Sequence, residues 1–404
     1  MPDRFRISAI GLAVLAAFAA LHELALPVYE FFTRVPDGMV KAHPFVDTRA
    51  VLQAAACWRA GVGVYHPSAC LDGGVFNYSP VLLRIGLLPI GPHDTLAVGL
   101  LLCLAFLAAL ALLPAPAPGW EFRFRLAASL SPASYYALEQ GNLDAGLFAA
   151  IMLAVWLLLR APRARLAAYG IFALGAAAKF YPVACFVLAL REKRGVVMAL
   201  AAAGLAGLAL VAALYGRDVA SALSIIPSGT PFRATFGRID LPRGLAMLHV
   251  LHSSAGLLSW AMAAAMLGAG LALHRYWARA LAVLDEPRRL YLVTGAAVTL
   301  FCFLAAQNIE YRAVYLLPTL PGLWWLGAAR PRMRVLLAAI MLLLWEAVPR
   351  ALISGLSQPY IPSPPAVWLW LLREGLWWWV AAEFTGLSFA FIFEQVRRLG
   401  GRKN

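Results

Sequence analysis

Two short polar stretches lie inside an otherwise apolar chain, and their side chains are of types that act on phosphate-bearing substrates. The stretch YYALEQGNLDAGL (135–147) contains Glu139, Gln140 and Asn142, and the stretch GAAAKFYPV contains a single lysine, Lys179. A carboxylate can remove a proton from a hydroxyl group, amides form hydrogen bonds with hydroxyls, and an ammonium group attracts phosphate. These residue types therefore predict a site for a substrate with hydroxyl and phosphate groups.

Asp47 is the candidate general base. It lies at the start of a stretch in which Val46, Ala50, Ala54 and Trp58 recur at helical intervals, which is typical of an amphipathic helix on a membrane surface. A solvent-accessible carboxylate there could take the proton of an acceptor hydroxyl while its oxygen attacks a carbon with a phosphate leaving group. The alternative is that Asp47 is a helix cap or a surface charge.

Lys179 is the candidate phosphate-binding cation. It follows three alanines and comes shortly before Pro182, where a new helix is expected to begin, so its ammonium group could point into a polar cavity. The alternative is that the side chain extends along a helix to the membrane interface. Arg49 is a further candidate for contact with a substrate phosphate.

The joint EQGN is predicted to bind sugar or acceptor hydroxyls. Gln140 and Asn142 offer donors and acceptors, Glu139 adds a carboxylate, and Gly141 allows a tight reversal between two helices. The alternative is ordinary loop chemistry, in which Asn142 caps the next helix.

Aromatic and charged residues in other polar joints complete the predicted site. Tyr78, Tyr311 and Tyr315 can stack on sugar faces or lipid headgroups, and Arg312 can contact a phosphate through two N–H groups. Tyr181 is a further candidate for binding the sugar or the acceptor. Glu310 is a candidate for binding hydroxyls. Alternatively, Glu310 and Arg312 form a structural ion pair.

The elements that position these residues must lie mostly in lipid. The chain has 404 residues, of which 62% are hydrophobic and 13% charged, and its mean hydropathy is +0.75. Its formal net charge is +14, but the basic residues flank apolar segments and form no dense patch, so no nucleic-acid partner is expected. About twelve apolar segments are expected, near 7–26, 81–113, 126–138, 143–159, 166–178, 182–190, 195–215, 254–274, 290–306, 313–328, 335–348 and 375–393.

Arginine-rich joints such as RAPRAR and ARPRMR set the expected orientation, because basic joints face the cytoplasm. Both termini are then cytoplasmic, the first helix is retained, and the alternate joints are external: 27–80, 139–142, 179–182, 216–253, 307–312 and 349–374. Several segments are too short to cross a bilayer, so we expect them to surround a cavity open to the outer face. The predicted fold is one all-α domain over 1–404, a polytopic bundle of about twelve transmembrane or partly embedded helices with interfacial helices in its long external loops.

The cysteines and known motifs exclude several classes of protein. The five cysteines have no metal-ligand spacing. The chain also contains no nucleotide-binding P-loop and no dinucleotide-binding, zinc-protease or serine-hydrolase motif. Neither a metal nor another cofactor is therefore expected. Cys57 and Cys70 both fall in the first external loop and could form a disulfide. Cys103, Cys185 and Cys302 are predicted to be buried in helices.

The order of these motifs resembles that of the integral-membrane glycosyltransferases of family 87, in the GT-C superfamily. The similar features are an aspartate before VYHP and FNYSP, then QGN, then AAAKFYP, between about Asp47 and Arg194. The resemblance implies transfer of a hexose, typically mannose, from a polyprenyl-phosphate sugar to a lipid or glycan acceptor outside the cytoplasm. It implies that Asp47 is the general base and that Lys179 is the lysine of a K-x-x-P element. Glu310 and Arg312 are proposed from their position alone.

Three other classes of function stay open, one of which is a purely structural membrane subunit. A carrier or flippase for a lipid-linked or anionic solute would use Lys179 and Arg312 as binding charges, and a related enzyme of the same superfamily would transfer another group. The polar residues gather at one face and no internal repeat is visible, which favours an enzyme. The alanine- and arginine-rich composition predicts a bacterial inner-membrane protein that contacts membrane lipids and whose active site faces the periplasm.

Overall fold

The chain is almost entirely helical. A computed structural model describes residues 3–39, 43–226, 229–251, 254–305, 307–356 and 362–401. Helices make up 79% of the structure, with almost no strand, which confirms an all-α membrane protein. Parts of three predicted external loops (27–80, 216–253 and 349–374), residues 1–2, residue 306 and the last residues of the C-terminal tail lie outside the described residues.

Only some of the predicted apolar segments form helices long enough to cross a membrane. Among the described residues there are seven, or eight if the bent pair α14–α15 forms one span; the bend in that pair is 52°. The seven are Arg4–Leu24, Pro92–Leu110, Leu143–Arg160, Arg194–Ser224, Ala255–Leu281, Glu286–Ala305 and Pro364–Gly401. The predicted count of about twelve is not confirmed, because several apolar runs form helices shorter than the roughly 20 residues that a span needs.

The chain forms two compact units. Unit 1 comprises Met1–Ala42, Leu107–Ala137 and Gly229–Asn404, and unit 2 comprises His43–Phe106 and Leu138–Ser228. The candidate residues Asp47, Asn142 and Lys179 belong to unit 2, whereas Glu310 and Arg312 belong to unit 1.

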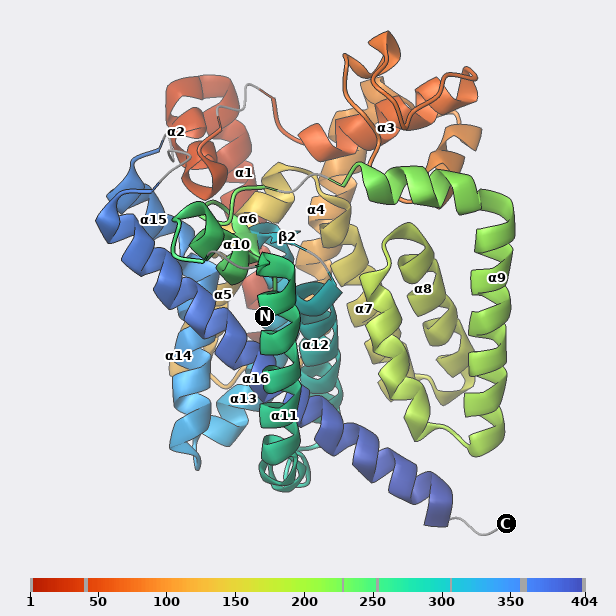
Figure 1. Ribbon diagram of the computed structural model, residues 1–404, viewed down its shortest axis with the longest axis vertical. Coiled ribbons are helices and arrows are strands. Elements are labelled where there is room, and N and C mark those ends of the chain that lie inside the picture. The colour runs from red at the N-terminus through yellow and green to blue at the C-terminus, as the bar shows by residue number, and fades with distance from the viewer. Residues whose placement is uncertain are drawn as a thin grey trace. The chain divides into compact units, whose positions relative to one another are not determined.

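Unit 2 contains a surface helix and a group of apolar helices. Its elements are α3 (Val46–Arg59), η1 (Ala69–Leu71), η2 (Pro80–Leu87), η3 (Pro92–Asp94), most of α4 (Thr95–Leu110), the end of α6 (Pro132–Glu139), α7 (Leu143–Arg160), η4 (Pro162–Ala164), α8 (Arg165–Ala178), η5 (Tyr181–Arg191) and α9 (Arg194–Ser224), where η denotes a 3₁₀ helix. The helices α7, α8 and α9 stand side by side, and α3 runs across their ends (Figure 1).

The amphipathic helix predicted from Val46 to Trp58 is confirmed as α3. Its apolar side is buried through Leu52, Ala54 and Cys57, and Phe76 and Leu83 from the following loop and 3₁₀ helix belong to the same buried core. Its N-cap residue is Phe45, which makes no side-chain cap bond. The alternative that Asp47 caps this helix is therefore wrong.

Unit 1 contains the longest helices. Its elements are α1 (Asp3–Leu24), α2 (Leu26–Asp37), the end of α4, α5 (Trp120–Ser129), most of α6, β1 (Thr235–Phe236), α10 (Asp240–Met247), α11 (Ala255–Leu281), α12 (Glu286–Ala305), β2 (Asn308–Ile309), η6 (Glu310–Thr319), α13 (Leu320–Gly327), α14 (Pro331–Trp345), α15 (Ala347–Ser354) and α16 (Pro364–Gly401). The two short strands pair antiparallel, with Thr235 opposite Ile309. This pairing holds the segment before α10 beside the start of η6.

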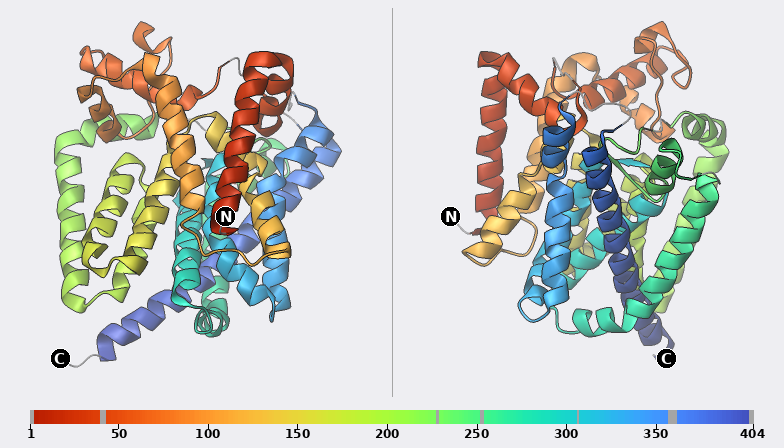
Figure 2. Two further views of the ribbon diagram at one scale, coloured as in Figure 1. Left: turned by 180° about the vertical axis from the view of Figure 1, so that it is seen from behind. Right: turned by 60° about the vertical axis from the view of Figure 1, so that its left-hand side comes forward.

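Close helix packing fixes the long helices of unit 1. Helices α11 and α16 pack along each other (Figure 1), and a Cβ atom at Gly270 would lie 2.3 Å from Thr385 Cγ2, so only glycine fits there. Near the contact, Glu383 accepts hydrogen bonds from Trp277, Trp379 and Arg332. Helix α2 folds back against the last turns of α1 (Figure 2), where the rings of Phe18 and Phe32 lie 5.8 Å apart.

Candidate functional site

The EQGN joint anchors the start of α3. The backbone N–H groups of Phe45 and Asp47 donate to the carbonyl oxygens of Glu139 and Gln140, at 2.7 and 3.0 Å. The Thr48 hydroxyl donates to the carbonyl oxygen of Gly141 at 2.5 Å. Three successive carbonyl groups thus hold the first turn of α3, which satisfies backbone groups that a helix end would otherwise leave unpaired.

Gly141 makes this close contact possible. Its φ of +57° lies in the left-handed region that residues with a Cβ rarely adopt. A Cβ atom at this position would lie 2.5 Å from Thr48 Oγ1 and 2.9 Å from Phe45 Cβ. The glycine is therefore required both by the tight reversal, as predicted, and by the approach of α3.

Asn142 connects the start of α7 to Asp47. Its Oδ1 accepts from the backbone N–H of Asp144 at 2.9 Å, so Asn142 caps α7, as the alternative interpretation of this joint had it. The same oxygen accepts from Lys179 Nζ at 3.0 Å. Because both partners are donors, the amide orientation is fixed and Asn142 Nδ2 faces Asp47, to whose Oδ2 it donates at 2.5 Å.

Lys179 forms a buried ion pair with Asp144. The distance from Lys179 Nζ to Asp144 Oδ2 is 2.8 Å, and the two side chains are 5% and 0% exposed. The ammonium group also lies 5.0 Å from the centre of the Tyr78 ring, a cation–π distance. Lys179 therefore does not extend along an exposed helix surface, and the snorkelling alternative is wrong. The predicted meeting of Lys179 with the 139–144 cluster is confirmed within unit 2.

The arrangement links four side chains in the order Asp47, Asn142, Lys179 and Asp144, and we call them the Asp47 chain. Asp47 is partly exposed, whereas Asn142, Asp144 and Lys179 are buried. Asp144 neutralises Lys179, so the carboxylate of Asp47 is the member of the chain that is accessible to an incoming hydroxyl group. This geometry suits a general base, because Asn142 orients the carboxylate of Asp47 while the Asp47 side chain stays partly exposed.

The other predicted residues of unit 2 surround this chain to different degrees. Gln140 Nε2 donates to the Glu139 carboxylate at 2.9 Å, and both residues are buried. Tyr181 is fully buried and packs against Phe180, at a ring distance of 6.0 Å. Arg49 is exposed on the first turn of α3. Of the two predicted cations of unit 2, Arg49 is thus the one that faces solvent.

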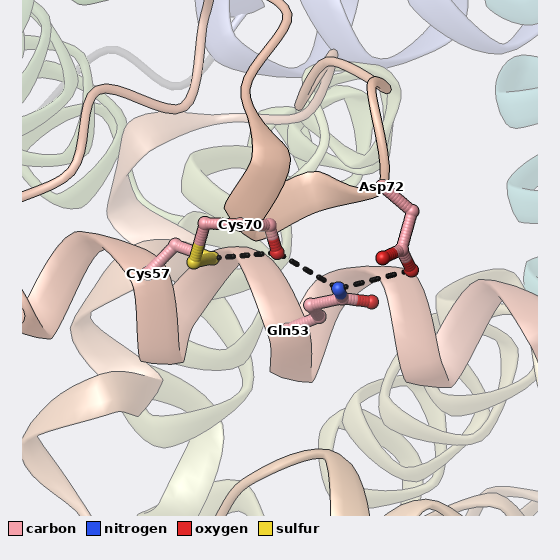
Figure 3. Close-up of a disulfide and its surroundings, with 4 residues drawn as sticks. All are labelled: Gln53, Cys57, Cys70 and Asp72. Carbon is pink, nitrogen blue, oxygen red and sulfur yellow. Dashed lines mark hydrogen bonds between the residues drawn. A yellow bond between two sulfur atoms is a disulfide. The ribbon is translucent and has the colours of Figure 1, made fainter.

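A disulfide fixes the loop that follows α3. Cys57 and Cys70 are bonded, and Gln53 Nε2 donates to the carbonyl oxygen of Cys70 at 2.8 Å and to Asp72 Oδ2 at 3.2 Å (Figure 3). The disulfide considered from the sequence is therefore present. Cys103, Cys185 and Cys302 are buried, as predicted, and form no disulfide among the described residues. The bond joins the helix that contains Asp47 to its own loop.

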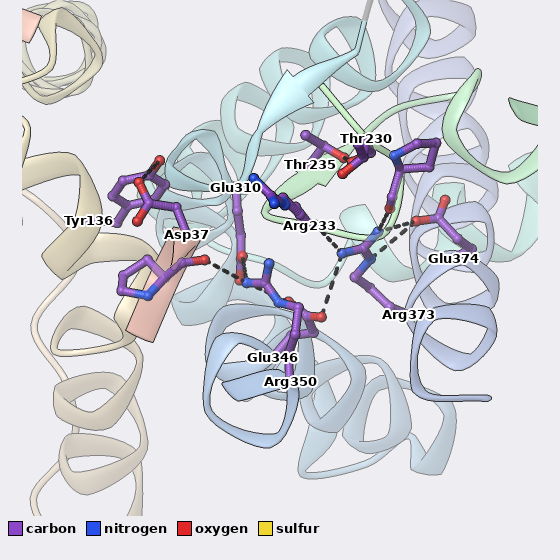
Figure 4. Close-up of polar contacts among 12 residues, drawn as sticks. Asp37, Tyr136, Thr230, Arg233, Thr235, Glu310, Glu346, Arg350, Arg373 and Glu374 are labelled. Carbon is purple, nitrogen blue, oxygen red and sulfur yellow. Dashed lines mark hydrogen bonds and ion pairs between the residues drawn. The ribbon is translucent and has the colours of Figure 1, made fainter. Parts of the chain in front are cut away.

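Unit 1 contains a second set of charged residues that the sequence interpretation largely missed. We call Glu310, Glu346, Arg350, Arg373 and Glu374 the ion-pair cluster (Figure 4). Arg350 Nη2 donates to Glu310 Oε2 at 2.6 Å and pairs with Glu346 Oε2 at 3.2 Å. Arg373 pairs with Glu346 Oε1 at 3.5 Å and with Glu374 Oε1 at 2.9 Å. All five residues are at most 5% exposed.

Backbone carbonyl oxygens also accept hydrogen bonds from the guanidinium groups of the cluster. Arg350 also donates to the carbonyl oxygen of Pro36 at 2.9 Å, and Arg373 donates to those of Pro231 and Arg233 (Figure 4). A signal for this cluster was present in the sequence, because charged residues inside apolar helices are rare and are usually paired. Their partners lie far apart in the chain, so the pairing could not be read from the sequence.

The predicted residues of η6 lie beside this cluster. Glu310 pairs with Arg350 and not with Arg312, so the predicted Glu310–Arg312 ion pair is wrong. Arg312 Nη1 donates to Asn308 Oδ1 at 2.5 Å. Tyr311 is buried, and its ring lies 5.4 Å from that of Tyr136, whose hydroxyl donates to Asp37. Tyr311 and Arg312 thus pack within unit 1.

Two carboxyl groups of unit 1 outside the candidate spans have raised pKa values. Burial raises the pKa of Glu310 to about 8, against the opposing effect of Arg350 and with a further increase from Glu346. Burial also raises the pKa of Asp240 to about 7, against the opposing effect of Arg373. Both groups are therefore far more easily protonated than exposed carboxylates.

No protein-family model matches the chain, and no curated protein or solved structure is significantly similar to it. Among the described residues, no group of three or more His, Cys, Asp and Glu side chains is arranged to hold a metal ion.

Proposed function

We propose that the protein is a membrane glycosyltransferase that moves a hexose, with mannose the first candidate, from a polyprenyl-phosphate sugar to a lipid or glycan acceptor. The observation on which this rests is the Asp47 chain, in which a partly exposed carboxylate is oriented by an amide whose own orientation is fixed. The seven candidate spans indicate a membrane-embedded protein, to which a lipid-linked donor would be available.

In the proposed reaction, Asp47 accepts the proton of an acceptor hydroxyl group. The acceptor oxygen forms a bond to the anomeric carbon of the donor sugar, and the bond from that carbon to the polyprenyl phosphate breaks with its electron pair. Attack from the face opposite the phosphate would invert the anomeric configuration. Asn142 acts as a positioning residue, because its Nδ2 group donates to Oδ2 of Asp47 and so orients the carboxylate.

The geometry changes the expected role of Lys179. Its ammonium group contacts Asp144 and Asn142, so in this proposal it fixes the amide of Asn142 and does not contact the donor phosphate directly. Arg49 is the better candidate for direct contact with the donor phosphate, since it is exposed and lies two residues from Asp47. A guanidinium group suits this role because it can donate two parallel hydrogen bonds to phosphate.

Sugar transfer by the purified protein tests the proposal. Wild type in nanodiscs would be incubated with radiolabelled polyprenyl-phosphate mannose and a bacterial lipid extract, and compared with Asp47→Asn and Asp72→Asn. The second variant is a matched control, because Asp72 is a carboxylate of the same loop that contacts Gln53 and lies outside the Asp47 chain. We expect a labelled product with wild type and Asp72→Asn, and a loss of about a hundredfold or more with Asp47→Asn.

The result also separates the enzyme from a carrier. If wild type transfers no sugar from any polyprenyl-phosphate donor but moves a labelled lipid-linked solute across liposomes, the carrier function replaces the transferase. If Asp47→Asn transfers as fast as wild type, Asp47 is not the base. A product that keeps the donor's anomeric configuration would contradict direct displacement.

A further inference from the structure

The ion-pair cluster of unit 1 has one more carboxyl group than it has guanidinium groups. Its three carboxyl groups belong to Glu310, Glu346 and Glu374, and its two guanidinium groups to Arg350 and Arg373. All of them are buried, and an uncompensated charge in a buried position is strongly unfavourable. A bound proton would remove the excess negative charge.

The contacts of Glu310 show where this proton would lie. Glu310 and Glu346 both pair with the same nitrogen of Arg350, at 2.6 and 3.2 Å, so the two carboxyl groups converge on one cation. Two ionised carboxylates in this position repel each other, whereas a proton on one of them would remove the repulsion and supply a donor for the other. The buried atom Glu310 Oε1 has no N–H or O–H donor among the described residues.

We propose that Glu310 and Glu346 form a proton-binding site, in which the two carboxyl groups share one proton beside Arg350. The described residues contain no metal-binding group that would supply the charge instead. The guanidinium groups are engaged by carboxylates and carbonyl oxygens, so a phosphate would have to displace these partners. The site is independent of the proposed sugar transfer.

The charged groups around this pair come from several elements. Arg350 belongs to α15, Arg373 and Glu374 to α16, and Asp240 to α10. On the side of α2, the carbonyl oxygen of Pro36 accepts from Arg350, and Asp37 accepts from Tyr136. The burial that raises the pKa of Glu310 to about 8 agrees with a site that holds its proton at neutral pH.

Loss of the proton would change the contacts at this end of unit 1. Two adjacent carboxylates would then share one guanidinium group, and their repulsion would weaken the link from η6 to α15. Arg350 also joins α15 to the end of α2, so a change in its position would reach three elements. The proton site therefore makes this part of the fold sensitive to pH.

Infrared spectroscopy of the full-length protein in nanodiscs tests the proposal. A protonated carboxyl group has its own carbonyl stretch, which we expect in wild type at neutral pH and which should disappear on titration with a midpoint near pH 8. Labelling the glutamates with ¹³C should shift this band, which distinguishes it from a band of Asp240. Glu310→Gln and Glu346→Gln should each lose the labelled, titrating band.

Glu383→Gln is the matched control. Glu383 is also fully buried, but its oxygens accept from four N–H groups of three residues and need no proton, so this variant should keep the band. The proposal is overturned if wild type shows no glutamate band that titrates, or if the band is unchanged in both Glu310→Gln and Glu346→Gln. Should a variant not fold, the ¹³C-labelled wild type still decides whether a buried glutamate titrates near pH 8.

Discussion

Asn142 Nδ2 lies 2.5 Å from Asp47 Oδ2, although 95 positions of sequence separate the two residues. The amide cannot rotate without losing its bonds from Lys179 and from the Asp144 backbone. The orientation of the candidate base is therefore set by a helix cap, and changes in this cap should affect catalysis more than folding.

Replacing Asn142 by aspartate should slow sugar transfer by about tenfold or more. The new carboxylate has no donor for Asp47, an unpaired buried group costs about 1–3 kcal/mol, and each 1.4 kcal/mol of barrier is a factor of about ten. The second carboxylate should also hinder ionisation of the base, which moves the low-pH limb of the rate profile to higher pH. The measurement is the single-turnover rate of sugar transfer against pH. The control is Asn77→Asp, which lies in the loop that follows α3. An unchanged pH profile would contradict the positioning role of Asn142.

Removing Lys179 alone should be strongly destabilising. In Lys179→Met, Asp144 becomes a buried carboxylate without its cation, which costs about 3–5 kcal/mol. The double variant Lys179→Met/Asp144→Leu should recover most of this loss, since it removes both charges. Unfolding in detergent measures the difference. Equal stability of the single and double variants would show that the ion pair contributes little.

Gly141→Ala should separate α3 from the EQGN joint. The left-handed φ and the clash with Thr48 together should cost more than about 1 kcal/mol. Gly170→Ala is the matched control, because Gly170 lies in α8 with open space around it and should gain about 0.5–1 kcal/mol of stability. The measurements are the midpoint of thermal unfolding and the transfer rate. A Gly141→Ala variant with the wild-type transfer rate would argue against this account of the joint.

The disulfide should stabilise unit 2. Cys57 and Cys70 are 13 positions apart, and closing a loop of about that size stabilises a fold by about 3 kcal/mol. Reduction should lower the unfolding midpoint of wild type but not that of Cys57→Ala/Cys70→Ala. Alkylation of the unfolded, unreduced chain followed by mass spectrometry should modify Cys103, Cys185 and Cys302 only. Five modified cysteines without reductant would show that the bond does not form.

Stability should fall as the pH rises through the titration of Asp240. Its pKa rises from 3.8 to about 7 on folding, so the folded state binds the proton more tightly than the unfolded state. The stabilising effect of this proton is complete below about pH 4 and is lost between about pH 4 and pH 7. Asp240→Asn should flatten this part of the curve of unfolding free energy against pH. An unchanged slope in the variant would assign the pH dependence to other groups.

Much of the fold class could be predicted because hydropathy is a local property of the sequence. Runs such as those of α1 and α9 are apolar over the length of a span whatever else the chain does. The number of spans was not predictable in this way, since the apolar residues of η5 and η6 serve packing between helices. Hydropathy alone does not distinguish a lipid-facing segment from a buried one.

The sequence by itself determined that the EQGN joint and Lys179 lie at the same end of two neighbouring helices, because one short connection, RAPRAR, joins these helices and makes them run antiparallel. Only the tertiary structure decided which charges meet. Asp144 pairs with Lys179 over 35 positions, and Glu310 pairs with Arg350 over 40. Such pairs depend on the rotation and depth of each helix, which are set by packing contacts along its whole length.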